Sequence, residues 1–290
     1  MEQWNHDAAR ELAVGYSNIP DSLILIAGQA DYPLLLARAA RKQGVQKIIA
    51  VAFKGETRRE ICEVADEVVW VRVGQLTAFL DAVRTADSSF AVMAGQIAPK
   101  NLFNVRMDRA LIDLLKILPM KNAHTIFGAI TAEIEKTGVQ MLPASSFMQD
   151  YLPGPGLLTK RAPDDRELSD IRIGRRVIKA TSHLDIGQTV VVKEGMVLAV
   201  EAFEGTNRAI RRGGKLGGPG AVVVKVPKDG HDMRFDIPVI GMETLRTLKK
   251  AKVSCLALEE GGAMLLEKEK LVCFADQLGI SIQVLEKEQI

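Results

Sequence analysis

Two apolar runs separated by a helical stretch constrain the fold more than any other feature, in "SLILIAGQADYPLLLARAARKQGVQKIIAVAF", residues 22–53. The first run, Leu23–Ala27, ends at Gly28, and the second, Ile48–Phe53, follows Gly44. Between them leucines and alanines recur at the spacing of a core-facing helix. Two apolar strands bridged by a helix indicate a parallel pair, because the helix carries the chain back to the end where the first strand began.

The same alternation continues along the first half of the chain. "EVVWVRV" at 67–73 and "FAVMAG" at 90–95 predict two more strands, with helices over 56–66 and 75–86. Residues 106–138 keep a helical pattern throughout. The first half is therefore predicted to be a doubly wound, Rossmann-like parallel sheet.

Prolines and glycines break both periodicities in residues 142–165, where we place the domain boundary. The predicted fold is α/β, with a Rossmann-like N-terminal domain at 1–155, whose first 20 residues are an extension, and a mixed α/β domain at 156–290. In order, the second half is predicted to contain a helix at 166–182, a hairpin turning at Glu194-Gly195, a strand in "GAVVVKVP", a strand in "DIPVIG", a helix at 242–250, strands in "CLALEEGGAMLL", a helix near 267–278 and a strand in "ISIQVL".

Composition excludes several classes of protein. The chain has 38 basic and 36 acidic residues among 290, so its net charge gives no electrostatic basis for nucleic-acid binding. No apolar run approaches the roughly 18 residues that a membrane helix needs, and no secretory signal opens the chain. Cys62, Cys255 and Cys273 are far apart and are expected to be reduced and partly buried. We expect a cytoplasmic protein that at most touches a membrane surface.

The turn Gly28-Gln29-Ala30 stands where a Rossmann fold binds phosphate, after the first strand and before the first helix. The GxGxxG fingerprint is absent, and no acidic residue ends the second strand at 51–53, so a nicotinamide-dependent oxidoreductase is not expected. Two alternatives stay open for this turn: a contact with a phosphate or nucleotide, or an ordinary tight turn.

Glu201 interrupts an apolar strand in "GMVLAVEAFEGTNRAIRRGG", residues 195–214. It would share a strand face with Val197, Ala199 and Phe203, which predicts that its side chain is buried. A buried carboxylate must be paired, protonated or bound to a cation.

The polar turn Glu204-Gly205-Thr206-Asn207 precedes Arg208, Arg211 and Arg212, which recur at helical spacing. Small polar residues followed by arginines suit phosphate capture. The alternative is a solvated, capped helix start. The glycine-rich residues 211–220 are expected to form a mobile segment near the same place.

"GHDMRFDIPVIG", residues 230–241, puts Asp232, Arg234 and Asp236 on one face if it is a strand. Carboxylates suit Mg²⁺, a hard ion that prefers oxygen ligands. An arginine between them suits a phosphate rather than a bare metal site. The alternative is a ladder of charges that faces solvent.

Four segments together resemble a known family, the UDP-2,3-diacylglucosamine pyrophosphatases of lipid A biosynthesis, in the form unrelated to metallophosphoesterases. The segments are "LIAGQADYPLLLA", "MAGQI" at 93–97, "LDIGQTVVVKEGMVLAVEAFEGTN" at 184–207 and "RFDIPVIG" at 234–241. The resemblance implies Mg²⁺-dependent hydrolysis of UDP-2,3-diacylglucosamine to UMP and 2,3-diacylglucosamine 1-phosphate (lipid X), with substrate between the two domains. It also implies transient contact with the cytoplasmic face of the inner membrane, and a homodimer is one option for the oligomeric state.

The family's essential aspartate lies in an Arg-x-Asp-x-Pro motif, which matches Arg234, Asp236 and Pro238. The resemblance implies catalytic roles for Asp236 and Arg234, and makes Asp236, Glu201 and Glu204 the expected metal ligands, with acceptance of a sugar hydroxyl as the alternative role for the two glutamates. The expected substrate-binding residues are Gly28, Gln29, Gly95, Gln96, Asp185, Gln188, Gly205, Thr206, Asn207, Arg211 and Lys225.

Two of the departures from the family pattern, at Asn207 and Val239, favour an alternative function, a non-catalytic protein of the same fold that binds a nucleotide sugar or a lipid. Asn207 stands where an aspartate is usual, Val239 replaces a common threonine, and the first glycine-rich turn is reduced to Gly28-Gln29-Ala30. Retention of Arg234 and Asp236 favours the enzyme.

Overall fold

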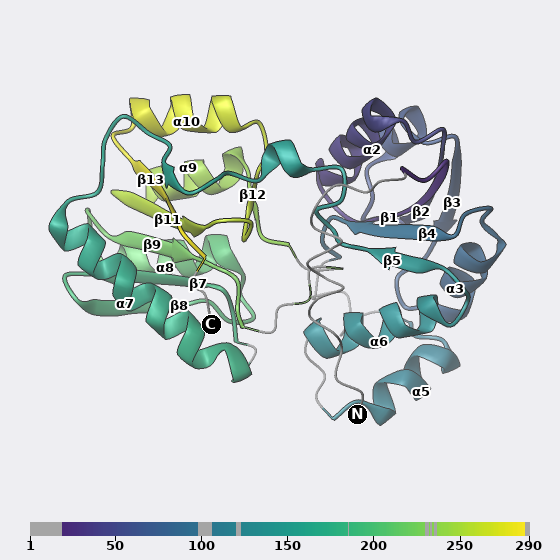
Figure 1. Cartoon of the computed structure of the whole chain (residues 1–290). Coiled ribbons are helices and arrows are strands. Elements are labelled where there is room, and N and C mark those ends of the chain that lie inside the picture. The colour runs from purple at the N-terminus through teal and green to yellow at the C-terminus, as the bar shows by residue number, and fades with distance from the viewer. Residues whose placement is uncertain are drawn as a thin grey trace. The chain divides into compact units, whose positions relative to one another are not determined.

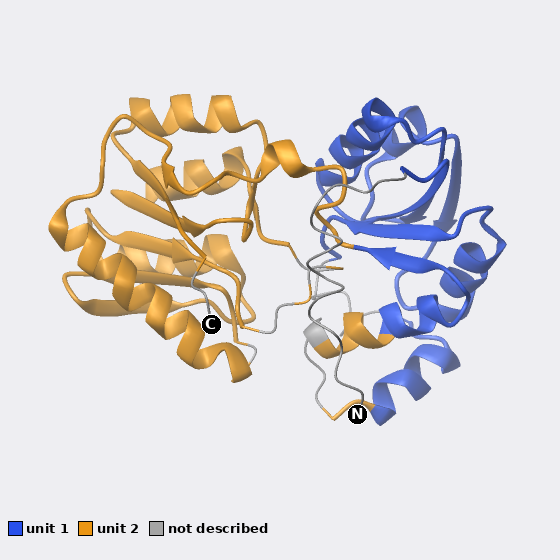
Figure 2. Ribbon diagram, viewed as in Figure 1, with its two compact units in different colours: residues 1–117, 130–142 blue, residues 118–129, 143–290 orange. Residues whose placement is uncertain are grey.

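Figure 2 shows that the chain forms two compact units. The first comprises Met1–Ile117 and Ile130–Leu142, and the second Leu118–Ala129 and Pro143–Ile290. The computed structural model describes residues 19–97, 106–119, 123–184 (the backbone alone at 123–124), 186–229, 232, 234 and 237–287.

The first unit is built on a parallel sheet whose strands run in the order β3-β2-β1-β4-β5 (Figure 1). This confirms the parallel sheet predicted for the first half, and the order is the one found in doubly wound nucleotide-binding folds. β1 and β2 are buried along nearly their whole length, as strands covered on both faces must be. The strands are β1 (Ser22–Ala27), β2 (Lys47–Phe53), β3 (Glu67–Val71), β4 (Phe90–Ala94) and β5 (Gln140–Leu142).

Helices connect these strands, and local signals set their ends. α2 (Tyr32–Gln43) has Pro33 in its first turn and ends at Gly44, whose φ of 117° needs glycine. The predicted helix at 75–86 is confirmed as α3 (Leu76–Thr85). The predicted helical region that follows contains α5 (Arg109–Ile117) and α6 (Ala123–Glu135).

The helix expected at 56–66 is wrong: this segment contains only the 3-10 helix η1 (Arg59–Glu63). Hydrogen bonds to the sheet hold both ends of the segment. The Thr57 hydroxyl accepts the Phe53 N–H at 2.8 Å, and the Asp66 carboxylate accepts the Ile48 N–H at 2.7 Å. These ties leave room for little more than one tight turn.

The second unit is built on a mixed sheet in the order β6-β13-β11-β9-β7-β8. β9, β11 and β13 run parallel, β7 is antiparallel to both β8 and β9, and β6 is antiparallel to β13. The predicted mixed α/β fold of the second half is confirmed. The strands are β6 (Gly156–Leu157), β7 (Thr189–Lys193), β8 (Met196–Val200), β9 (Val222–Lys225), β11 (Cys255–Glu259) and β13 (Ser281–Leu285), with a separate parallel pair of β10 (Val239–Ile240) and β12 (Met264–Leu265).

Helices cover both faces of this sheet, and alternate strand residues pack against each layer. Val190, Val192 and Val222 pack with α7 (Asp165–Thr181), whereas Val191 and Val223 belong to the core on the other face. That second layer comprises α8 (Thr206–Gly217), α9 (Met242–Lys250) and α10 (Lys268–Gln277), of which α9 and α10 agree with the helices predicted at 242–250 and near 267–278. Short 3-10 helices η2 (Gln149–Tyr151) and η3 (Ser182–Leu184) complete the unit.

The glycine-rich residues 211–220 were expected to be mobile, and this is wrong because residues up to Gly217 form the C-terminal part of α8. A Cβ on Gly213 would lie 2.6 Å from the Cβ of Val191, and one on Gly217 would lie 2.2 Å from a methyl of Leu198. The glycines therefore allow α8 to approach the sheet closely, which a larger residue would prevent.

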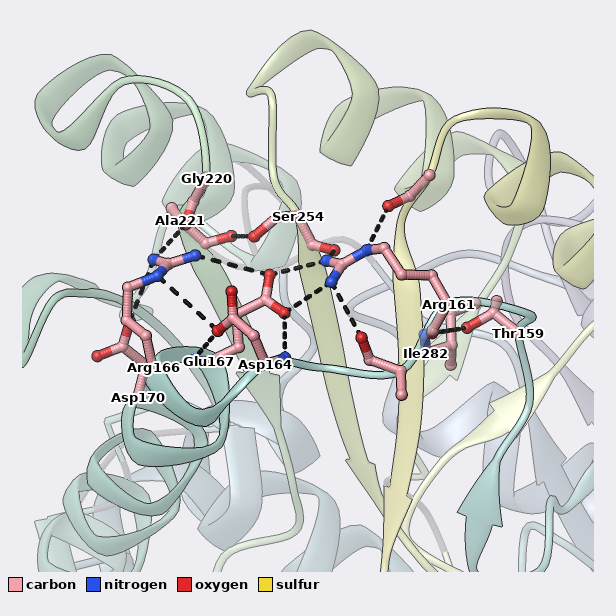
Figure 3. Close-up of polar contacts among 12 residues, drawn as sticks. Thr159, Arg161, Asp164, Arg166, Glu167, Asp170, Gly220, Ala221, Ser254 and Ile282 are labelled. Carbon is pink, nitrogen blue, oxygen red and sulfur yellow. Dashed lines mark hydrogen bonds and ion pairs between the residues drawn. The ribbon is translucent and has the colours of Figure 1, made fainter.

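The N-terminus of α7 is held by a network of charged side chains (Figure 3). Asp164 and Glu167 form a capping box. Arg161 donates to both oxygens of Glu167, at 2.8 and 2.7 Å, and also to the backbone carbonyls of Ser254 and Gly279. The Glu167 carboxylate is almost fully buried, so this bidentate pair ties α7 to the strands beside it.

The three cysteines are all free thiols. Cys255 is buried in β11, but Cys62 and Cys273 are exposed, so the expected partial burial is wrong for these two. They lie on outward-facing positions of η1 and α10. Within the described part of the chain, no helix has the length and apolar character needed to cross a membrane.

Candidate functional site

In the first unit, identical Ala-Gly-Gln tripeptides at 27–29 and 94–96 end the neighbouring strands β1 and β4. The strands pair with Ala27 opposite Ala94, where the strand order reverses. Open α/β sheets bind ligands at this switch point. The structure therefore brings together four of the predicted substrate-binding residues, Gly28, Gln29, Gly95 and Gln96.

The two loops bond to each other through their backbones. The Gly28 N–H donates to the Ala94 carbonyl at 2.7 Å, and the Gln29 N–H donates to the Gln96 carbonyl at 2.9 Å. A Cβ on Gly28 would lie 2.4 Å from the Gly95 carbonyl oxygen, so only glycine fits there. Because both N–H groups are used within the protein, a phosphate contact by this turn would have to use other groups.

Three residues that the sequence analysis missed lie beside this turn, in the loop after β2. Glu56 accepts a hydrogen bond from the Gln29 side chain, the Thr57 hydroxyl donates to the end of β1, and Arg58 pairs with Asp31. Their position directly after the second strand could have identified these three residues, because parallel strands end at the same edge of a sheet.

In the second unit, Glu201, Thr206 and Lys225 form a hydrogen-bonded series. Lys225 ends β9 and pairs in register with Thr189 of β7, while Thr206 is the first residue of α8. The Lys225 ammonium donates to the Thr206 hydroxyl at 2.7 Å, and that hydroxyl donates to Glu201 Oε1 at 3.0 Å. The Thr189 hydroxyl lies 3.4 Å from the hydroxyl oxygen of Thr206. An ammonium can only donate, so the Thr206 proton points to Glu201.

Both charged members of this series are buried: Glu201 is 9% exposed and Lys225 is 5% exposed. Glu201 Oε2 has no hydrogen-bond partner, and no carboxylate among the described residues forms an ion pair with Lys225. The predicted burial of Glu201 is confirmed. Its predicted strand face is wrong, because β8 ends at Val200 and the flanking Val197 and Phe203 are exposed.

Other predicted residues surround this series. Gly205, at φ 82°, precedes the first residue of α8. The side-chain oxygens of Gln188 and Asn207 are buried without a hydrogen-bond partner, while the Asn207 amide donates to Glu243 at 3.3 Å. Gly187, another residue that the sequence analysis missed, lies so close to Glu201 that a Cβ would be 2.3 Å from its carbonyl oxygen. The buried oxygens of Gln188 and Asn207 are therefore acceptors that the described residues leave unused.

Glu204 and Arg211 are placed differently. Glu204 pairs with Arg212, and the hydrogen bond from that guanidinium lowers the pKa of the Glu204 carboxyl. Arg211 is exposed on α8. Of the expected metal ligands that the structure describes, Glu201 thus has an oxygen without a partner and Glu204 is already ion-paired. In the described ranges, no group of three histidine, cysteine or acidic side chains could hold a metal ion.

The segment that contains Arg234 is not a strand where the structure describes it. Residues 232, 234, 237 and 238 lie outside strands, and β10 begins only at Val239. The Asp232 carboxylate accepts the Arg234 N–H at 3.0 Å and pairs with its guanidinium at 2.8 Å. This local turn competes with an extended backbone, which explains why the strand prediction is wrong there. Asp236 and Asp185 lie outside the described residues.

The fold and these two clusters define a two-domain α/β protein with polar groups gathered where such proteins bind ligands. Residues 22–151 match the LpxI N-terminal domain and residues 154–283 match the LpxI C-terminal domain. The chain belongs to the LpxI family. It is similar to the UDP-2,3-diacylglucosamine pyrophosphatase LpxI of Caulobacter vibrioides, with 27% identity over 282 residues, which cover 91% of this chain and 98% of the relative.

Proposed function

We propose that this chain hydrolyses the pyrophosphate bond of UDP-2,3-diacylglucosamine to give UMP and 2,3-diacylglucosamine 1-phosphate in lipid A biosynthesis. The observation that carries the proposal is the match of both halves, in order, to the two LpxI domains. The activity named for the Caulobacter relative, which aligns over 98% of its length, supports it. The buried polar series around Thr206 supplies charged groups of the kind that such chemistry uses.

Hydrolysis forms one P–O bond and breaks another. The oxygen of a water attacks one phosphorus, the bridging P–O bond breaks, and a proton of the water passes to a base. Negative charge on both phosphates repels the attacking oxygen, so the site must neutralise that charge and orient the water. From the resemblance, Asp236 is proposed to orient the water and Arg234 to hold phosphate charge, in addition to its pairing with Asp232.

Mg²⁺ is part of the proposal, and the buried Oε2 of Glu201, which has no partner, can serve either as its ligand or as the acceptor of a sugar hydroxyl. When bound, the ion would neutralise charge on the phosphate oxygens. Glu204 fits less well, since its carboxylate is paired with Arg212. Asp236 is proposed as a further ligand from the resemblance alone.

The proposed substrate carries two acyl chains, which leads us to propose a cytoplasmic protein with transient contact with the inner-membrane surface. A homodimer is proposed as its assembly. Sedimentation of the purified protein with and without lipid vesicles would test both proposals.

The deciding experiment follows UMP release from UDP-2,3-diacylglucosamine in the presence of Mg²⁺. Wild-type protein is compared with Asp236→Ala, with an EDTA-treated sample and with Asp81→Ala, which removes an exposed carboxylate on α3. Release by the wild type and Asp81→Ala, lost in Asp236→Ala and EDTA, would support the proposal. Tight substrate binding without release under any divalent metal would instead support the non-catalytic binding protein.

A further inference from the structure

The Lys225 ammonium is a buried charge that forms no direct ion pair with a described residue; the nearest carboxylate in its series, Glu201, is reached only through Thr206. Its side chain is 5% exposed at the end of a central strand, and its one hydrogen-bond partner is the neutral hydroxyl of Thr206. A lysine ammonium has three donors, so two of them have no partner among the described residues. Burial disfavours an ammonium unless an anion or several acceptors compensate for the lost water. The position therefore suits an anionic ligand.

The partner of this lysine is the first residue of a twelve-residue helix, α8. The first N–H groups of a helix have no acceptor within it, and the helix dipole favours negative charge at this end. No side chain caps α8, because its N-cap residue is Gly205. The buried ammonium and the helix N-terminus are independent features that favour the same kind of ligand, an oxyanion.

Glu201 adds a hydrogen-bond acceptor to the site, beside the donors that suit an oxyanion. Its Oε1 accepts from Thr206, while its Oε2 is buried without a partner. Its backbone N–H donates to the Thr189 carbonyl at 2.8 Å, which fixes the residue at the sheet. A carboxylate oxygen in this state accepts an O–H or N–H from a ligand. An oxyanion with a hydroxyl nearby is the chemistry of a sugar phosphate.

The turn in the first unit lacks these features. The N–H groups of Gly28 and Gln29 already donate to the carbonyls of Ala94 and Gln96. The turn at Gly28-Gln29, where a phosphate contact was expected, therefore uses two of its backbone N–H donors within the protein. Lys225 in the second unit keeps two N–H donors that have no partner among the described residues. Of the two clusters, the one around Lys225 has the donors that a phosphoryl group needs.

We propose that Lys225 and the N-terminus of α8 bind the phosphoryl group of a sugar phosphate, that Glu201 accepts one of its sugar hydroxyls, and that Thr206 positions both side chains. This subsite rests on the proposed function and assigns part of its substrate to the second unit. The same chemistry occurs in UMP and in glucosamine 1-phosphate, the two polar fragments of the proposed substrate.

Binding of UMP, glucosamine 1-phosphate and inorganic phosphate to the full-length protein, measured by calorimetry at constant ionic strength, tests the subsite and distinguishes the two sources. Wild-type protein is expected to bind one sugar phosphate more tightly than inorganic phosphate. Lys225→Met should weaken that binding about 10- to 100-fold. Lys215→Met, which removes an exposed lysine from the last turn of α8, should leave it within about twofold. Equal binding by wild type and Lys225→Met would overturn the proposal.

Two further measurements keep the proposal testable if Lys225→Met does not fold. In the wild type, the backbone amide resonances of Thr206 and Asn207 should shift on addition of the sugar phosphate, and unchanged resonances would overturn the subsite. Glu201→Gln should lose the preference for the sugar phosphate over inorganic phosphate while it still binds inorganic phosphate. A retained preference would exclude the hydroxyl contact.

The subsite and the proposed function can fail separately. Hydrolysis of UDP-2,3-diacylglucosamine without Lys225-dependent binding would reject the subsite and keep the function. Lys225-dependent binding of a sugar phosphate without hydrolysis by the wild type would keep the subsite and reject the function.

Discussion

The ammonium of Lys225 donates to the hydroxyl of Thr206 across 2.7 Å, so the last residue of β9 is tied to the first residue of α8. The same hydroxyl donates to Glu201. The neutral hydroxyl of Thr206 thus lies between the buried Lys225 cation and the buried Glu201 anion, which do not pair directly. Both charged groups use this hydroxyl as a hydrogen-bond partner.

Replacing Thr206 by valine keeps the shape of the side chain and removes this hydroxyl. Two buried charged groups then lose a partner, so the free energy of unfolding is expected to fall by about 2 kcal/mol. Thr206→Ser keeps the hydroxyl and should remain within about 1 kcal/mol of the wild type. Urea denaturation of the three proteins measures the difference. No loss in Thr206→Val would show that the hydroxyl does not contribute to stability.

Gly28→Ala should disrupt the joined loops of the first unit. The added Cβ would lie 2.4 Å from the backbone of Gly95, so one loop must move, with an expected loss of about 1–3 kcal/mol. Gly128→Ala in α6 is the matched control. No atom lies within 4 Å of its added Cβ, so it should be neutral or stabilise by up to about 1 kcal/mol. Thermal unfolding of both variants checks this, and a stable Gly28→Ala protein would contradict the close contact.

Glu167 is expected to make stability depend on acid pH. Despite its burial, the hydrogen bonds from Arg161 lower its pKa to about 2, from 4.5 in the unfolded chain. A carboxyl whose pKa is lower in the folded state stabilises fully above the unfolded pKa and loses this effect as pH falls toward the folded pKa. The contribution, about 3 kcal/mol at neutral pH, should therefore disappear between about pH 5 and pH 2.

The difference in unfolding free energy between wild type and Glu167→Gln isolates this effect. It should be largest at pH 7 and shrink at pH 4 and pH 3, as measured by urea denaturation at each pH. A difference that is constant across this range would mean that packing of the side chain, not its charge, stabilises α7.

The three thiols should differ in reactivity. Burial raises the pKa of Cys255 to about 12, so it stays protonated and covered in the folded protein. Cys62 and Cys273 are exposed and should react with a thiol reagent under native conditions, while Cys255 reacts only after unfolding. Counting modified thiols before and after addition of denaturant tests this. Rapid native modification of Cys255 would contradict its position in β11.

Sequence periodicity predicted the strands and most helices well because their patterns arise from burial, which acts over many residues at once. It failed where one side chain overrides the pattern: Thr57 and Asp66 shorten the expected helix to η1, and Asp232 turns the chain at Arg234. The glycines of α8 were mistaken for mobile residues because their purpose, close packing on Val191 and Leu198, depends on residues distant in sequence.

The candidate site was predicted in part. Glu201 and Thr206 were selected from the sequence pattern and Lys225 from the family resemblance, and the structure places them in one hydrogen-bonded series. Their order could not be read from the sequence, because it depends on the pairing of β7 with β9 and on the position of α8 above them. The roles of Asp236 and Asp185 stay predictions, since both lie outside the described residues.

The glycines of α8 have a consequence for how substrate preference changes over evolution. The helix is a rod about 18 Å long, with Thr206 at one end and Gly217, against Leu198, at the other. A bulkier residue in place of Gly217 would tilt α8 and displace its N-terminal end at Thr206. Natural variation at such remote positions is therefore expected to alter ligand preference at the proposed subsite without changing any of the residues proposed to contact the ligand.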